Sequence, residues 1–185
     1  MIDAALARRI RLVGFDVDGT MTDGGLYIGV AGDRPVELKR FDIQDGLGVH
    51  LLRAAGLLVA VVTGRAGDAA RLRAEELQAD EFAADGGARK LPAFEEMLQR
   101  RRVTWEEACF IGDDLPDLPL LRRVALPVAV ANACPEVAGA ARFTTAAAGG
   151  HGAVRELAEA LLKARGEWSG LVERYLRERA DAGAR

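Results

Sequence analysis

Two carboxylates stand two residues apart after a short apolar run near the start of the chain. Asp16 and Asp18 follow Leu12–Phe15, which has the composition of a buried strand. In extended backbone, residues two apart face the same way, so both side chains can point from the strand's carboxyl end towards one ligand. Carboxylates this close repel each other unless a cation lies between them, and oxygen ligands favour Mg²⁺. The pair predicts a magnesium site, with a solvated turn as the alternative.

A second acidic loop follows another predicted strand. It holds Asp113, Asp114 and Asp117 after the apolar run Cys109–Ile111. Parallel strands end at one edge of a sheet, where α/β proteins bind their ligands, so Asp113 or Asp114 can complete a metal site begun by Asp16. The alternative for Asp113 and Asp114 is capping of the helix that follows.

Groups that suit a phosphoryl group lie between the two acidic loops. Thr63, Gly64 and Arg65 directly follow a predicted strand, and Lys90 lies near the start of a predicted helix. A hydroxyl, the backbone amides at a helix start and an ammonium group together form a cradle for phosphate. Lys90 taken alone is more often a solvated surface lysine. The order acidic loop, threonine, lysine, acidic loop is what favours phosphoryl chemistry.

The elements that must position these residues alternate along the chain. Apolar runs predict four parallel strands: Leu12–Phe15, Leu57–Val62, Cys109–Ile111 and Val128–Val130. Helical patterns lie between them: Leu47–Ala55, Asp68–Leu77, Pro92–Arg101 and Pro116–Arg123. This alternation predicts a three-layer, Rossmann-like α/β fold with a parallel sheet flanked by helices, and residues 1–185 are expected to form a single domain.

One segment breaks the alternation and predicts a protruding β-hairpin over about 25–41. Two apolar runs, Leu26–Val30 and Val36–Phe41, flank a short turn of Ala, Gly, Asp and Arg. Apolar groups on a projecting hairpin are costly to expose unless a partner covers them, which favours an oligomer. The alternative is a hairpin that folds back on its own domain.

The C-terminal tail has helical spacing of its apolar residues over about 153–179. It predicts two helices separated near Gly166, and the last residues, 180–185, are expected to fray.

Composition and charge exclude other classes of protein. The chain has 185 residues, with 25 Lys and Arg against 28 Asp and Glu, a net charge of −3, and 5% aromatic residues. A nucleic-acid binder would show a basic excess and stacking aromatics, so no nucleic-acid partner is expected. No apolar run approaches the ~18 residues that span a bilayer, and the N-terminus lacks the apolar core of a signal peptide. The chain is therefore predicted to be cytoplasmic, with no membrane partner.

The ordered motifs resemble those of the haloacid dehalogenase superfamily of phosphohydrolases. They are DVDGT, VTGR, Lys90 and GDDLPD. Within that superfamily, the stretches DVDGTMTDGGLY, FDIQDGLGVHLLRAAG, VTGR and GGHGAVRE are similar to those of the small phosphatases acting on 3-deoxy-D-manno-octulosonate 8-phosphate, a sugar-acid precursor of lipopolysaccharide. The resemblance implies a fold without a cap domain, since only the hairpin and one helix separate the first two motifs.

The resemblance also implies catalytic roles for the matching residues. Asp16 would be the nucleophile that forms an aspartyl-phosphate, and Asp18 would protonate the leaving group and later accept a proton from water. Thr63 and Lys90 would stabilise the phosphoryl oxygens.

A Mg²⁺ cofactor is implied in the same way. Asp16, the main-chain carbonyl of Asp18, and Asp113 would hold the ion, with Asp114 and Asp117 in support.

For the substrate, the backbone at Gly64 and the guanidinium groups of Arg65 and Arg73 are the candidates, since the planar fork of arginine suits a sugar-acid carboxylate. The alternative for Arg73 is a surface ion pair with a nearby glutamate. Two positions depart from the family pattern: His151, for which an exposed loop histidine is the alternative, and Asp85, which adds negative charge near the phosphate pocket.

The resemblance further implies a homotetramer in which a neighbour's hairpin and C-terminal segment close each site. A phosphatase for a nine-carbon, sialic-acid-like 9-phosphate, a non-catalytic tetramerisation module and a phosphomutase remain as alternatives. The module would have no chemical need for Asp16, Asp18, Thr63, Lys90 and Asp113 together, and a phosphomutase would need a cap to exclude water.

Overall fold

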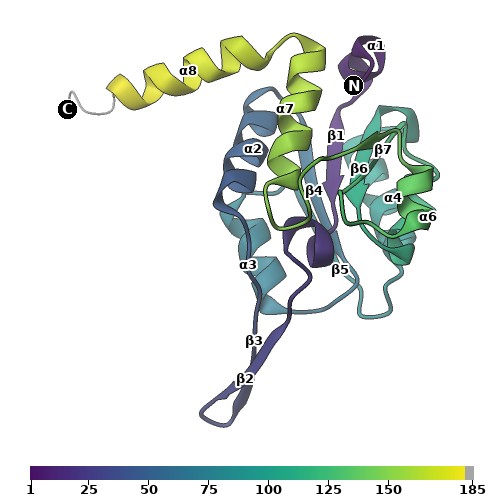
Figure 1. Cartoon of the computed structure of the whole chain (residues 1–185), viewed down its shortest axis with the longest axis vertical. Helices are drawn as coiled ribbons and strands as arrows, with labels where there is room; N and C mark the ends of the chain where they lie inside the picture. Colours follow the sequence, from purple (N-terminus) through teal and green to yellow (C-terminus); the bar gives the residue numbers. More distant parts are fainter. Residues whose placement is uncertain (182–185) are drawn as a thin grey trace.

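The computed structural model describes residues 1–181, and 182–185, part of the segment expected to fray, lie outside the described residues. Its centre is a six-stranded parallel sheet with the order β5-β4-β1-β6-β7-β8 (Figure 1). The strands are Leu12–Phe15 (β1), Leu58–Thr63 (β4), Glu81–Ala84 (β5), Ala108–Gly112 (β6), Leu126–Ala129 (β7) and Phe143–Thr144 (β8). This order places the three strands that carry the predicted motifs, β1, β4 and β6, side by side.

The central strands form because their residues are apolar and covered on both faces of the sheet. All of β1 is buried, and it pairs with β4 on one side and β6 on the other, so that Phe15 aligns with both Val61 and Ile111. Gly14 is required by packing, because a Cβ there would lie 2.6 and 2.7 Å from the rings of two buried phenylalanines. The three strands therefore end level with one another, where the chain turns into polar loops.

Helices cover both faces of this sheet (Figure 1). One hydrophobic cluster joins the sheet to α1 (Ala4–Arg9), α2 (Ile43–Ala54), α3 (Asp68–Glu76) and α7 (Ala153–Arg165). A second cluster, on the opposite face, joins it to α4 (Lys90–Arg101), α5 (Leu118–Leu121) and α6 (Pro135–Ala140). The predicted three-layer α/β fold is confirmed.

The sequence prediction missed several short elements and one helix start. β5 and β8 are edge strands that are only partly buried, and α1 and α6 have six residues each, too few to show a period. α2 begins at Ile43 rather than Leu47 because the Asp42 carboxylate caps it, accepting a hydrogen bond from the amide of Gln44 at 2.8 Å. The helix predicted over 116–123 is instead a turn of 3-10 helix, Leu115–Asp117, followed by α5.

A two-stranded antiparallel hairpin projects from the body of the molecule, as predicted (Figure 1). It consists of β2 (Tyr27–Ala31) and β3 (Arg34–Leu38). A bridge between Thr22 and Phe41 closes its root. Apart from this hairpin, the chain between β1 and β4 holds only the loop after β1 and α2, so the described residues include no cap domain.

The tail forms the two predicted helices. α7 ends where Gly166 takes the left-handed conformation, with a φ of 78°, and α8 (Trp168–Asp181) then runs away from the sheet (Figure 1). Within residues 1–181, no helix combines the length and the apolar character needed to cross a membrane.

Candidate active site

The predicted site residues meet at the carboxyl edge of the sheet, where Asp16 follows β1 and Asp113 follows β6. An open cleft there is lined by Asp16, Asp18, Gly64, Arg65, Ala88, Lys90, Asp113, Asp114, Pro116 and Asp117. All of these except Ala88 and Pro116 were candidates from the sequence. Thr63, the last residue of β4, is fully buried directly behind this lining.

Lys90 supplies a buried cation to the cleft. Its side chain is 5% exposed, and its Nζ donates to the carboxylates of Asp16 and Asp117, the latter at 2.7 Å. Burial works against the charge of Lys90, but the two carboxylates outweigh it and raise the pKa of the ammonium group. Burial, together with the charge of Asp117, raises the pKa of Asp16 well above its ordinary value. The solvated-lysine alternative for Lys90 is wrong.

Three carboxylates offer a place for a divalent cation. Asp16, Asp113 and Asp117 each have an oxygen within 4.8 Å of the others. Burial also raises the pKa of Asp113. It is therefore unfavourable for all three carboxylates to be ionised together unless a cation binds between them. The loop closes tightly around them at Gly19, where φ is 90° and a Cβ would lie 2.1 Å from Oδ2 of Asp113. Oxygen donors gathered in this way fit a hard ion.

Asp117 organises the second acidic loop. Its Oδ2 accepts hydrogen bonds from the backbone amides of Asp113 at 3.1 Å and Asp114 at 3.4 Å. Asp114 instead caps the following turn, with its Oδ1 accepting from the amide of Leu115 at 2.8 Å. The capping alternative thus describes the side chain of Asp114, whereas the side chain of Asp113 belongs to the three-carboxylate group.

Asp18 faces the cleft from the side of β4 and stands outside the three-carboxylate group. Its Oδ2 accepts a hydrogen bond from the Oγ1 of Thr63 at 3.3 Å, and Thr63 Oγ1 accepts from the amide of Arg65 at 3.1 Å. At Gly64, a Cβ would lie 3.1 Å from that of Ala88, so this glycine allows the loops to approach closely. Asp18 therefore lines the cleft opposite the acidic group, with one oxygen held by Thr63.

Lys39, which follows β3 at the root of the hairpin, was missed by the sequence analysis. Its side chain is 1% exposed, and its Nζ lies 2.6 Å from Oδ1 of Asp18 and 3.3 Å from Oε1 of Glu37. Strand alternation could have found it, because Glu37 and Lys39 are two residues apart and so face the same side of the hairpin.

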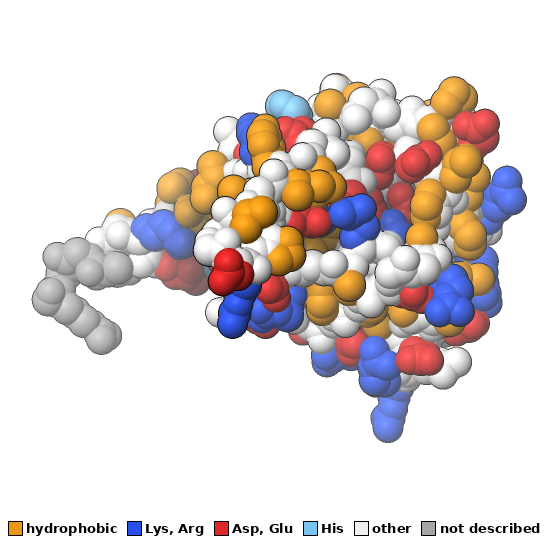
Figure 2. Space-filling view, turned by 90° about the horizontal axis from the view of Figure 1, so that it is seen from below, with side chains coloured by type: hydrophobic (Ala, Val, Ile, Leu, Met, Phe, Trp, Pro, Cys, Tyr) orange, Lys and Arg blue, Asp and Glu red, His pale blue; other side chains and the backbone are white. Residues whose placement is uncertain are grey.

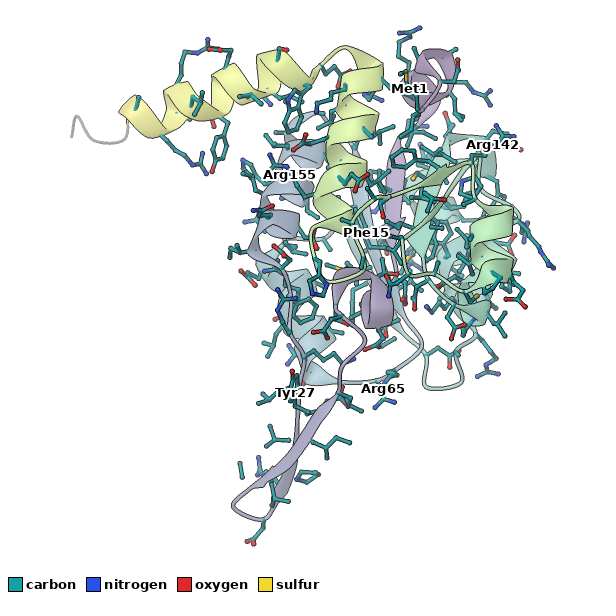
Figure 3. The ribbon with its side chains drawn as sticks, viewed as in Figure 1. Met1, Phe15, Tyr27, Arg65, Arg142 and Arg155 are labelled. Atoms are coloured by element: carbon teal, nitrogen blue, oxygen red, sulfur yellow. The ribbon has the colours of Figure 1, made fainter. Side chains whose placement is uncertain are left out.

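The two arginines predicted to bind a substrate carboxylate have different surroundings. Arg65 lines the cleft, is half exposed and lies with its Nη2 3.0 Å from Oε2 of Glu37 (Figure 3). Arg73 is buried outside the cleft, where its guanidinium donates to the carbonyl oxygen of Asp42 at 3.0 Å and to Glu76 at 2.8 Å. Arg73 does not line this chain's own cleft, and its pairing with Glu76 agrees with the ion-pair alternative, although its side chain is buried and not at the surface.

Comparison with known proteins agrees with this geometry. The family model of haloacid dehalogenase-like hydrolases matches residues 83–157. The chain is 39% identical over 163 residues to the 3-deoxy-D-manno-octulosonate 8-phosphate phosphatase of Escherichia coli K12, a match that covers 88% of this chain and 85% of that protein. The chain belongs to this phosphatase family of the haloacid dehalogenase-like hydrolases. A relative of the same name from Yersinia pestis is 39% identical over 164 residues, covering 89% of this chain and 86% of its own.

Solved structures of haloacid dehalogenase-like hydrolases extend the similarity to the whole fold. The 3-deoxy-D-manno-octulosonate 8-phosphate phosphatase from Moraxella catarrhalis, solved in complex with a magnesium ion, a phosphate ion and a KDO molecule, is 32% identical with a TM-score of 0.86 and covers 93% of this chain and 97% of its own. A putative hydrolase of the superfamily from Legionella pneumophila is 38% identical with a TM-score of 0.87, covering 94% of this chain and 93% of its own.

In this haloacid dehalogenase-like hydrolase, the glycine-rich loop before α7 packs directly on the loop that follows β1. A Cβ at Gly149 would lie 1.7 Å from the carbonyl oxygen of Gly19, and the amide of Gly150 donates to the carbonyl oxygen of Thr20 at 3.0 Å. The hydroxyl of Thr20 in turn donates to Asp113 at 3.2 Å. The C-terminal part of the chain therefore supports the cleft from behind, a role that the sequence analysis did not predict.

The two residues that depart from the phosphatase family pattern lie outside the lining of the cleft. His151 is exposed, with its Nδ1 2.8 Å from the carbonyl oxygen of Gly149, as the loop-histidine alternative predicts. Asp85 accepts from the amide of Gly87 at 2.8 Å and pairs with Arg89 at 3.3 Å. Its charge is therefore engaged away from Lys90 and the acidic group.

Proposed function

We propose that this chain is a Mg²⁺-dependent phosphatase that hydrolyses 3-deoxy-D-manno-octulosonate 8-phosphate to the free sugar acid and phosphate. The observation that carries the proposal is the meeting of Asp16, Lys90 and Asp113 at the carboxyl edge of β1 and β6. Membership of the family, at 39% identity to relatives with that activity in their name, supports the substrate. The cytoplasmic location and the single-domain organisation stay predictions.

Asp16, Asp113 and the main-chain carbonyl of Asp18 would hold the Mg²⁺. Asp117 and Asp114 would support it, Asp117 most directly because its oxygen lies in the same group as those of Asp16 and Asp113. The bound ion would offset the crowded negative charge and polarise the phosphoryl group.

Asp16 is the nucleophile of the proposed reaction. One of its carboxylate oxygens bonds to phosphorus as the bond from phosphorus to the sugar oxygen breaks, which leaves an aspartyl-phosphate. Asp18 gives a proton to the departing sugar oxygen and later takes one from the water that attacks phosphorus, releasing phosphate and restoring Asp16. Lys90 stabilises the charge that develops on the phosphoryl oxygens, and the hydroxyl of Thr63, which donates to Asp18 in this structure, would turn its proton towards them when phosphate is bound.

Arg65 is the group placed to select the sugar acid. It lines the cleft beside Gly64, whose backbone lies next to the phosphate cradle, and its half-exposed guanidinium can make paired hydrogen bonds to a carboxylate.

We also propose that the protein is a homotetramer in which neighbouring hairpins and C-terminal segments close the sites. The hairpin exposes large apolar side chains: Tyr27, Ile28, Val30 and Leu38. Figure 2 looks at the end of the molecule that carries the hairpin and shows hydrophobic side chains exposed there. Because the hairpin projects, the fold-back alternative is wrong, and a second chain is the cover that such a surface favours. Light scattering tests this, and a monomer that still selects its substrate would contradict closure by a neighbour.

The proposed function is tested by phosphate release from a panel of sugar-acid phosphates, with and without Mg²⁺. The expected result is metal-dependent hydrolysis that strongly favours the eight-carbon 2-keto-3-deoxy acid over the nine-carbon 9-phosphate. Asp16→Asn should abolish turnover, whereas Asp33→Asn, the same change at the exposed hairpin turn, should not. Preference for the nine-carbon compound would move the enzyme to that substrate, and release from neither would support a non-catalytic module.

A further inference from the structure

Lys39 is a buried lysine that the proposed reaction does not use. It follows β3 at the root of the hairpin, and its side chain is 1% exposed. Lysine is almost never fully buried unless its charge is paired, because taking an ammonium group out of water costs several kcal/mol. The groups that compensate this charge therefore indicate what Lys39 does.

Both groups that pair with Lys39 are carboxylates at the edge of the cleft. Its Nζ lies 2.6 Å from Oδ1 of Asp18 and 3.3 Å from Oε1 of Glu37. The other oxygen of Asp18, Oδ2, accepts a hydrogen bond from Thr63 at 3.3 Å. Asp18 thus has a cation from the hairpin beside one oxygen and a hydroxyl from β4 that donates to the other.

The contacts continue from Glu37 to the candidate substrate arginine. Oε2 of Glu37 lies 3.0 Å from Nη2 of Arg65, and the hydrogen bond from Arg65 holds the pKa of Glu37 below its ordinary value despite some burial. Asp18, Lys39, Glu37 and Arg65 therefore form a line of alternating charge along the root of the hairpin, where Figure 3 shows Arg65.

The backbone that carries Lys39 is itself attached to the loop of Asp18. Thr22 and Phe41 form a bridge across the root of the hairpin, and the Thr22 hydroxyl accepts a hydrogen bond from the amide of Gly19 at 3.3 Å. The hairpin root that carries Lys39 is thus joined to the loop that carries Asp18.

We propose that Lys39 is a positioning residue for Asp18: its ammonium group holds the acid–base carboxylate beside Thr63, directed at the leaving group, and makes the geometry of the reaction depend on the hairpin. This inference rests on the proposed function, because it needs Asp18 to donate the proton. Without Lys39, Asp18 loses its hairpin contact and Glu37 is left with Arg65 alone.

The test measures kcat/KM of the full-length protein with two substrates. Lys39→Met should lower kcat/KM for the sugar-acid phosphate by about tenfold to hundredfold, within what general-acid catalysis contributes. With p-nitrophenyl phosphate, whose leaving group departs without a proton, the loss should stay below about threefold. Lys39→Arg, which keeps the cation, should recover most of the activity on the sugar-acid phosphate. Lys163→Met, the same change at an exposed lysine paired with Glu159, should leave both substrates unaffected.

Equal losses on the two substrates would mean that Lys39 has a merely structural role and would overturn the inference. Unchanged kcat/KM with the sugar-acid phosphate would overturn it as well. If Lys39→Met does not fold, the double variant Lys39→Met/Glu37→Gln also removes one of the two carboxylates that lose the Lys39 cation, and the same comparison of substrates is made with it. The proposed function fails separately, when the unmodified protein hydrolyses no sugar-acid phosphate at all.

Discussion

The Nζ of Lys90 lies 2.7 Å from Oδ1 of Asp117, and this ion pair joins the start of α4 to the second acidic loop. Both side chains are buried, and the same ammonium group reaches Asp16 at the end of β1. One cation therefore holds together the ends of two strands and a helix. It compensates charge that water cannot reach.

Replacing Lys90 by methionine should destabilise the protein as well as inactivate it. The substitution leaves Asp16 and Asp117 buried without their cation, and breaking a buried ion pair on one side costs about 3–5 kcal/mol. Urea unfolding of the metal-free protein measures this. Lys163→Met, which breaks an exposed pair, is the matched control and should cost about 1 kcal/mol or less. A Lys90→Met protein as stable as the parent would contradict the buried pairing.

Mg²⁺ should stabilise the folded protein through the same carboxylates. An ion that binds only the folded state adds about 2.7 kcal/mol at a concentration one hundred times its Kd. Asp113→Asn removes one donor of the group and should abolish most of this increase, whereas Asp33→Asn should keep it. Thermal unfolding with Mg²⁺ and with a chelator provides the measurement. An equal shift in Asp113→Asn and in the parent would place the ion elsewhere.

Gly149→Ala should impair the cleft although residue 149 does not line it. A Cβ at this position would overlap the carbonyl oxygen of Gly19, and backbone cannot rotate away as a flexible side chain can. The expected cost is about 1–3 kcal/mol of stability, with a fall in kcat. Gly170→Ala is the control, because a Cβ there meets nothing within 4 Å and favours α8. Equal behaviour of the two variants would show that the loop contact does not support the site.

A buried carboxylate outside the cleft should give the stability a pH dependence of its own. Asp45 on α2 caps α7, its Oδ1 accepting from the amide of Arg155 at 2.8 Å, while its Oδ2 is buried with no hydrogen-bond partner (Figure 3 labels Arg155). Burial raises the pKa of Asp45 from 3.8 to about 6, and the nearby charge of Asp42 also raises it. The folded protein thus binds this proton more tightly than the unfolded chain does.

The stability gained from protonated Asp45 is complete below about pH 3.8 and is lost as the pH rises through about 6. A shift of this size corresponds to about 3 kcal/mol. Asp45→Asn keeps the capping oxygen and removes the charge, so the variant should gain on the parent between pH 4 and pH 7.5. Urea unfolding at several pH values measures the difference between the two proteins. A difference that does not change with pH would refute the assignment. Asp3→Asn, at an exposed helix cap, is the control for replacing a capping aspartate by asparagine.

The sequence was sufficient for the parts of the fold and site that depend on local pattern. Buried strands and the acids that follow them are adjacent in the chain, so Asp16 and Asp113 could be assigned to one edge as soon as β1 and β6 were assumed to be parallel neighbours. β5 and β8 could not be predicted in this way, because edge strands need no continuous apolar run.

The residues that were missed, and the surroundings of Arg73, depend on contacts between distant segments. Lys39 reaches Asp18 only because the hairpin returns to the loop after β1, and Gly149 meets Gly19 only once α7 has packed on α2. Arg73 was assigned to the substrate because of its position in a motif, yet Asp42 and Glu76 engage its guanidinium outside the cleft. The sequence pattern alone predicts none of these contacts.

The bridge between Thr22 and Phe41 holds the two ends of the hairpin segment together at the body of the molecule, so its closure does not depend on the turn at its tip. The entropy of closing such a loop grows only slowly with its length, so residues inserted at the exposed turn of Gly32 and Asp33 should hardly alter folding. A peptide tag or a fluorophore at this turn would separate assembly from folding. If the protein forms the proposed homotetramer, the insertion would keep the hairpin of one subunit from contacting another while leaving each subunit's sheet intact. The selectivity of the resulting protomer could then be compared with that of the tetramer.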